Sequence, residues 1–202
     1  MFKRTNSYLL LTMLVLTGFA GKIHSDTLTG KERRQLVQEL RSSKGTLSES
    51  IEGLSDKQFE FVSKQHGFSI RQCILHLASL EHRLWSKSKK LMEQPATSFV
   101  KVNSCDEEIS ILSAMLEANH HPAPQQVSAS HADINKALKQ FRNDRQSMVR
   151  YIRTTTNNLH NYQVEANNSQ FDIYHLLTLN AKYTEACARI IDDIKRSPGF
   201  PK

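Results

Sequence analysis

The stretch from Ser69 to Gln94 reads SIRQCILHLASLEHRLWSKSKKLMEQ and decides the fold class. Its apolar residues return at the spacing of one helix face, and a serine that can cap a helix stands at its start. The members of this face are Ile70, Ile74, Leu77, Leu84 and Leu91, and an adjoining stripe holds Cys73, His76 and Leu80. Pro95 ends the pattern. The stretch therefore predicts a long amphipathic helix over about residues 70–94.

Three other stretches carry the same helical periodicity, over about residues 31–52, 132–157 and 171–195. Glycine and proline are scarce, with 7 and 5 residues, which argues against a fold rich in tight turns. Four long amphipathic helices, with a long connection between the second and the third, predict an all-α four-helix bundle.

Residues 96–130, between the second and third helices, are expected to be less regular than the helices. Thr29 or Thr27 is expected to cap the first helix. Residues 56–68 are expected to form a loop with one short turn, in which Phe59 and Phe61 act as apolar anchors. Residues 157–168 are expected to form a polar connection.

The N-terminus predicts a secretory signal peptide. Lys3 and Arg4 precede an apolar run from Tyr8 to Phe19, and small residues lead to a cleavage site after Ala20. The run is shorter than the about 20 residues that a membrane span needs, although an uncleaved anchor is the alternative. A later cut after Ser25 is also compatible with the sequence.

Two segments and a compartment follow from this interpretation. Residues 1–20, or up to 25, form the signal peptide, and residues 26–202 form the bundle. The mature protein is then secreted or periplasmic, with no membrane association after cleavage. Cleavage after residue 20 removes two of the 27 basic residues and none of the 20 acidic ones, so the net charge falls from +7 to +5. This mild surplus comes without a basic stripe of base-reading groups, so nucleic-acid binding is not expected.

Several segments in order resemble the DinB-like superfamily. They are Leu28–Arg33, Ile51–Ser55, Phe68–Leu77, Tyr151–Leu159, Leu179–Cys187 and Lys195–Pro201. The resemblance covers nearly all of the chain after residue 26. It implies a four-helix bundle with a metal site of three histidines, one on the second helix and two one turn apart on the fourth. It also implies a relation to thiol-dependent transferases that use bacillithiol or mycothiol, and to many proteins of unknown activity.

The chain departs from the family's ligand set. His76 matches the ligand of the second helix, but Tyr183 and Cys187 stand where the resemblance places the two histidines of the fourth. A neutral phenol is a poor ligand for zinc or nickel, and a thiolate ligand prefers further strong donors. The resemblance therefore predicts a degraded metal site at His76, Tyr183 and Cys187, with Cys73 one turn before His76 as a neighbour.

Three interpretations of this cluster stay open. Cys73 and Cys187 are small core residues in the first, and they form a disulfide between the second and fourth helices in the second. In the third, His76, Cys187 and either Tyr183 or Cys73 form a remodelled metal site. Cys105 is the third cysteine, and an odd count leaves at least one thiol unpaired. The adjacent His120 and His121, beside two prolines, are expected to lie in a solvated loop.

Three hypotheses of function follow. The first is an exported DinB-like bundle without the standard metal chemistry, which binds a small molecule or a protein partner through a cavity near His76. No resident cofactor is expected in that case. The second is a metal-dependent thiol S-transferase or hydrolase that holds zinc, nickel or iron with an altered His/Cys/Tyr set. The third is a structural protein that forms a homodimer through outer helix faces.

Overall fold

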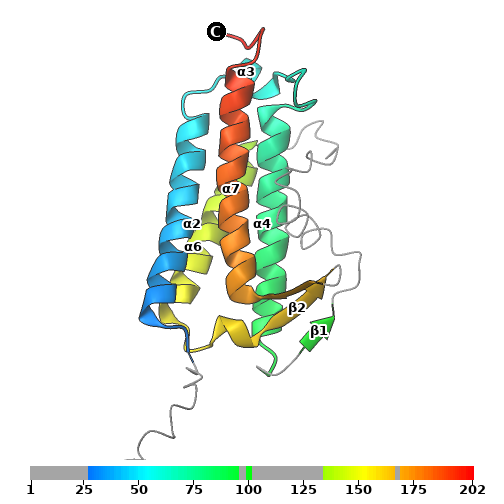
Figure 1. Ribbon diagram of the computed structural model, residues 1–202. Coiled ribbons are helices and arrows are strands. Elements are labelled where there is room, and N and C mark those ends of the chain that lie inside the picture. Colours follow the sequence, from blue (N-terminus) through cyan, green and yellow to red (C-terminus); the bar gives the residue numbers. More distant parts are fainter. Residues whose placement is uncertain (1–26, 96–98, 102–133, 167–168) are drawn as a thin grey trace, which may run out of the picture.

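The computed structural model describes residues 27–95, 99–101, 134–166 and 169–202. Four long helices lie side by side in it as a bundle, namely α2 (Gly30–Ile51), α4 (Ile70–Met92), α6 (Ile134–Thr154) and α7 (Ile173–Lys195) (Figure 1). Helix α2 packs against α6 and α7, and α4 packs against the same two helices. The predicted all-α four-helix bundle is confirmed. The predicted signal peptide, the loop with His120 and His121, and Cys105 lie outside the described residues.

The helices begin where the sequence places capping side chains. The Thr29 hydroxyl accepts a hydrogen bond from the backbone of Glu32, and the Glu32 carboxylate accepts one from the Thr29 backbone, so the two residues form a capping box. Ser69 and Gln72 form the same arrangement at the start of α4. The alternative that Thr27 caps the first helix is therefore wrong. Within the described ranges, no helix is long and apolar enough to cross a lipid bilayer.

The predicted loop after α2 holds a short helix, α3 (Asp56–Glu60). Phe59 and Phe61 are partly buried against the core, as expected, and the Phe61 ring meets Phe200 edge to face at 5.4 Å between centroids. The Gln58 side chain donates a hydrogen bond to the carbonyl of Pro201. The residues that follow α7 thus pack against α3.

A small sheet lies at the other end of the bundle (Figure 1). Strand β1 (Phe99–Lys101) pairs in parallel with β2 (Gln163–Ala166), which pairs in antiparallel register with β3 (Ser169–Asp172). A 3₁₀ turn, η1 (Leu159–Asn161), precedes β2. The polar connection predicted over residues 157–168 thus contains a 3₁₀ turn and strand β2, which the sequence did not predict. Val164 and Phe171 lie opposite each other in the β2–β3 hairpin, and both are buried. Burial of these two apolar side chains explains why the hairpin packs against the end of the bundle.

The centre of the bundle contains a charged pair. Arg145 of α6 contacts Glu81 of α4 through both Nε and Nη2, with 2.9 Å between Nε and Oε1. Helix α7 contributes Asn180, which donates to Glu81, and Thr184, whose hydroxyl accepts from Arg145. Ser43 of α2 also accepts from Arg145. All of these side chains are buried, so a polar network spans the four long helices inside an otherwise apolar core.

Candidate metal sites and an arginine-lined groove

The structure brings the four residues of the family position together. Cys73 and His76 lie on α4, and Tyr183 and Cys187 lie on α7. Each is 2–4% exposed, and the His76 and Tyr183 rings meet edge to face with 6.1 Å between centroids. The predicted cluster is therefore a buried seam between two helices rather than a surface feature.

Hydrogen bonds connect the phenol and the two thiols. The Tyr183 hydroxyl interacts with the Cys187 sulfur, and the Cys187 thiol interacts with Cys73. The pKa of Cys187 is raised well above its ordinary value, first by the hydrogen bond with Cys73 and then by burial. Burial also raises the pKa of Tyr183, with further contributions from both thiols. Protonated Tyr183 and Cys187 are thus strongly favoured, whereas metal ligation by either residue needs the deprotonated form.

Cys73 and Cys187 are both free thiols in the structure. Their hydrogen bond places them as neighbours across the interface of α4 and α7. The structure therefore describes the reduced form of the pair, and the disulfide between them stays a prediction.

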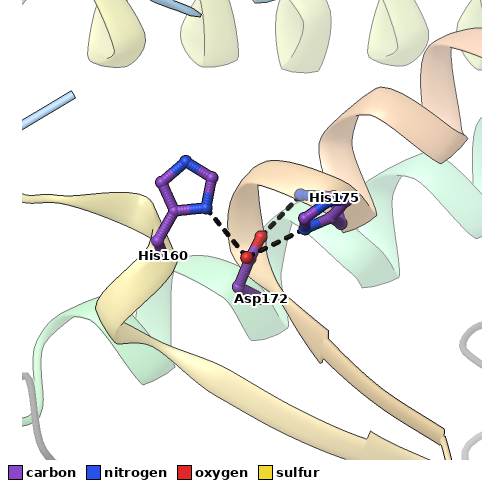
Figure 2. Close-up of side chains that lie close together, drawn as sticks. All are labelled: His160, Asp172 and His175. Atoms are coloured by element: carbon purple, nitrogen blue, oxygen red, sulfur yellow. Dashed lines mark hydrogen bonds and ion pairs between the residues drawn. The ribbon is translucent and has the colours of Figure 1, made fainter. Parts of the chain in front are cut away.

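A second cluster lies at the N-terminal end of α7 (Figure 2). It consists of His160 from η1, Asp172 at the end of β3 and His175 in the first turn of α7. One potential ligand atom from each lies within 4.8 Å of the others. The Nδ1 atoms of both histidines lie 2.8 Å from the same oxygen, Oδ2 of Asp172. Two imidazoles and a carboxylate are a donor set suited to a divalent transition metal.

Asp172 holds this position because it also starts α7. Its other oxygen, Oδ1, accepts a hydrogen bond of 2.8 Å from the backbone N–H of His175, the N-cap arrangement. One carboxylate oxygen therefore caps the helix, and the other faces the two imidazoles. The carboxylate is only 13% exposed, whereas His175 is 63% exposed. Asp172 is thus held in place by the helix cap, whereas His175 is open to solvent.

Further acidic groups lie beside the cluster. Glu32 of α2 places Oε1 at 3.4 Å from Nε2 of His160, on the ring edge away from Asp172. The Tyr174 ring lies against His160, with 4.8 Å between centroids. The pKa of Tyr174 is raised, first by burial and then by the charges of Glu39, Glu32 and Asp172. Three carboxylates therefore act on this region, and their charges favour a cation.

The sequence offered little signal for this cluster. Asp172 and His175 are three residues apart, but His160 is twelve residues before Asp172, and the β2–β3 hairpin brings it beside the other two. Only the role of Asp172 was readable, because an aspartate directly before an apolar helical run is a typical N-cap.

A groove is formed by residues of α2 and α6. Its volume is about 560 Å³, and its lining is Arg33, Arg34, Val37, Gln38, Arg41 and Ser42 of α2 with Arg153 of α6. The α2 residues repeat at steps of four, so they form one face of that helix. Arg33 donates hydrogen bonds to the carbonyls of Ile152 and Thr155 at the end of α6. Arg34, Arg41 and Arg153 are exposed, so the groove presents guanidinium groups to solvent.

No curated protein matches this sequence. Among solved structures, the chain is similar to YfiT from Bacillus subtilis, described as a probable metal-dependent hydrolase with an unusual four-helix bundle topology. The TM-score is 0.63 at 14% sequence identity, and the match covers 85% of this chain and 90% of YfiT. At this identity the likeness shows a common fold.

The family comparison goes further than the structural one. The model of the DinB superfamily matches residues 39–184, a range that includes α4, α6 and the first half of α7. This range spans more than half of the chain and contains His76 and Tyr183, whereas Cys187 lies just beyond it. The chain therefore belongs to the DinB superfamily.

Proposed function

We propose that this protein is an exported DinB-superfamily bundle that binds a small anionic molecule in the α2–α6 groove and does not use the family's metal position. The observation that carries the binding proposal is the groove itself. Its volume of about 560 Å³ lies in the range of small-molecule sites. Guanidinium groups bind carboxylate and phosphate oxygens in a two-point geometry, so phosphate- or carboxylate-bearing molecules are the expected ligands.

The buried seam at His76 supports the negative half of the proposal. Tyr183 and Cys187 occupy the positions of two ligands, and the shifts in their pKa values favour the protonated forms. A divalent ion would have to displace both protons inside a core that disfavours charge. The cavity near His76 expected from sequence is replaced in this proposal by the surface groove on α2 and α6.

Calorimetric titration with pyrophosphate and citrate tests the binding proposal, with sucrose as an uncharged probe. The double variant Arg41→Ala/Arg153→Ala should weaken anion binding at least about tenfold, because two exposed guanidinium groups are lost. Arg33 is left in place because it holds the end of α6. Lys182→Ala removes an exposed charge from α7 and should bind the anions as the wild type does. Equal binding by the wild type and the double variant would contradict the proposal.

Export is a part of this proposal that rests on the sequence of residues 1–20. It predicts that the protein expressed in a native-like host loses these residues and accumulates outside the cytoplasm. N-terminal sequencing of the mature protein tests it. An intact Met1 in the mature protein would count against export by a cleaved signal peptide.

A metal-dependent enzyme with an altered ligand set is the second candidate. The convergence of Cys73, His76 and Cys187 favours it, because a thiolate and an imidazole are good zinc ligands. This candidate predicts that His76→Ala loses both metal and activity. Full activity of the His76→Ala protein would remove it, whereas metal content alone would not, because zinc bound at another site can persist in this variant.

A further inference from the structure

We propose that His160, Asp172 and His175 form a binding site for a divalent transition-metal ion, separate from the family position. The site would take an ion of the zinc or nickel class through two imidazole nitrogens and one carboxylate oxygen. The proposal goes beyond the anion-binding function, since its three ligands lie on η1, β3 and α7, whereas the groove is lined by α2 and α6. It is argued from four features of the cluster.

The first feature is the convergence of donors on one point. Both Nδ1 atoms lie 2.8 Å from Oδ2 of Asp172 (Figure 2). In a tetrahedral zinc site with bonds of about 2.0–2.2 Å, neighbouring ligand atoms lie about 3.3 Å apart. Each nitrogen–oxygen pair therefore has to open by about half an ångström, which requires small rotations of both the His160 and the His175 rings. The three donors leave room for water at the remaining position.

The second feature is the partner on the far edge of His160. Histidines that bind metals usually donate their other ring N–H to a carboxylate, which fixes the tautomer. Glu32 Oε1 lies 3.4 Å from Nε2 of His160 and is the carboxylate in that place. In the structure, Nδ1 of His160 lies at hydrogen-bond distance from Oδ2 of Asp172, and an ion bound between them would replace the proton that joins them. The ring proton would then sit on Nε2, facing Glu32.

The third feature is that the two carboxylate oxygens of Asp172 have different partners. Because Oδ1 caps α7, the carboxylate is held in one orientation before any ion binds. The carboxylate is therefore pre-arranged, and the two imidazole rings have to adjust around it. Pre-arrangement of ligands lowers the free-energy cost of binding.

The fourth feature is the local charge. A helix N-terminus by itself favours anions, by about 0.3–1 kcal/mol for an exposed group. Here Asp172, Glu32 and Glu39 lie near enough to act on the Tyr174 ring, and three full negative charges exceed the half charge of a helix end. The balance of charge therefore favours a cation at the cluster.

Calorimetric titration of the chelator-treated full chain with zinc tests the site, with magnesium as the comparison ion. The wild type should bind one zinc ion per chain here and should not bind magnesium measurably, because the donor set is rich in nitrogen. His175→Ala removes an exposed ligand. Asp172→Asn keeps an oxygen for the helix cap but replaces the other donor atom. Loss of a hydrogen-bond partner of a metal ligand weakens binding about tenfold to hundredfold. Each of these two variants loses a ligand itself and should weaken zinc binding by more than that.

Three further variants separate this site from other zinc ligands in the chain. Glu32→Gln keeps the capping box, because glutamine serves in the same place, and should weaken zinc binding about tenfold to hundredfold. His76→Ala should leave binding unchanged, and so should the double variant His120→Ala/His121→Ala. The proposal is overturned if the wild type binds no zinc, or if His175→Ala and Asp172→Asn both bind as the wild type does. It is also overturned if His76→Ala or the double variant abolishes binding.

Discussion

Arg145 of α6 and Glu81 of α4 form a two-point ion pair in which both side chains are almost completely buried. The pair is also hydrogen-bonded to neighbours, because Thr184 accepts from the guanidinium and Asn180 donates to the carboxylate. Buried charges are tolerated when each is paired and hydrogen-bonded, and they are costly when one partner is removed. The stability of the bundle should therefore respond sharply to changes at this pair.

Replacement of Arg145 by methionine should destabilise the fold by about 3–5 kcal/mol, because Glu81 is left as a buried charge without its partner. Urea unfolding followed by circular dichroism measures the change. Arg142→Met, on the exposed side of the same helix, should change the free energy of unfolding by less than about 0.5 kcal/mol. The double variant Glu81→Leu/Arg145→Met should be more stable than Arg145→Met alone. A loss below about 1 kcal/mol in Arg145→Met would contradict the assigned role of the pair.

The same variant should show a characteristic dependence on pH. Burial raises the pKa of Glu81, and Arg145 opposes the rise, so loss of Arg145 should raise the pKa further. Between the unfolded and folded pKa values, the native state keeps a proton that the unfolded state has released. The free energy of unfolding therefore falls as pH rises through that window. The deficit of Arg145→Met against the wild type should be larger at about pH 7 than at about pH 4. Urea titrations at both values measure it, and an equal deficit would contradict the explanation.

Replacement of Thr29 by alanine should destabilise the protein by about 1 kcal/mol, because the capping box at the start of α2 is lost. Thr46→Ala is a matched control, since Thr46 lies exposed in the interior of the same helix and bonds only to its own helix turn. It should change the free energy of unfolding by less than about 0.5 kcal/mol. Thermal or urea unfolding of the two variants gives the comparison. Equal losses of stability would show that loss of the cap is not the cause of the effect of Thr29→Ala.

The thiols of Cys73 and Cys187 should react slowly in the native protein. Thiol reagents attack the thiolate, and both burial and a raised pKa keep Cys187 protonated. In a Cys105→Ser background, a chromogenic thiol reagent should find no fast-reacting group before unfolding and two groups in denaturant. Fast labelling of the native protein would contradict the buried geometry. Absence of thiols in denatured, non-reduced protein would establish the disulfide instead.

Local chemistry made the fold predictable from sequence. The apolar repeat and the capping residues Thr29 and Ser69 are readable within a few positions, and the long helices begin within two residues of expectation. The hairpin was not predictable. Each strand has one large apolar residue, Val164 or Phe171, and is otherwise mostly polar, so the alternating pattern of a strand is too short to recognise. The resemblance of several segments to one family made it possible to predict that His76 lies close to Tyr183 and Cys187.

Contacts between side chains of distant segments could not be predicted from the sequence. Arg145 visibly interrupts the apolar face of its helix, and Glu81 falls on the same stripe as Ile74, Leu77 and Leu84. Two opposite charges on two core stripes are a usable signal, but their meeting depends on which helices are neighbours. The cluster of His160, Asp172 and His175 likewise depends on a chain reversal.

Arg145 is bonded to groups on all three other long helices, including the Leu40 carbonyl and the Ser43 hydroxyl of α2. A partly assembled bundle that lacks α2, α4 or α7 leaves some donors of this guanidinium facing hydrocarbon or forces water into the core. Such intermediates are high in free energy, because an unmet buried donor costs about 1–3 kcal/mol and more when it is charged. One side chain thus couples the assembly of the four helices, and the bundle is expected to fold and unfold as a single cooperative unit.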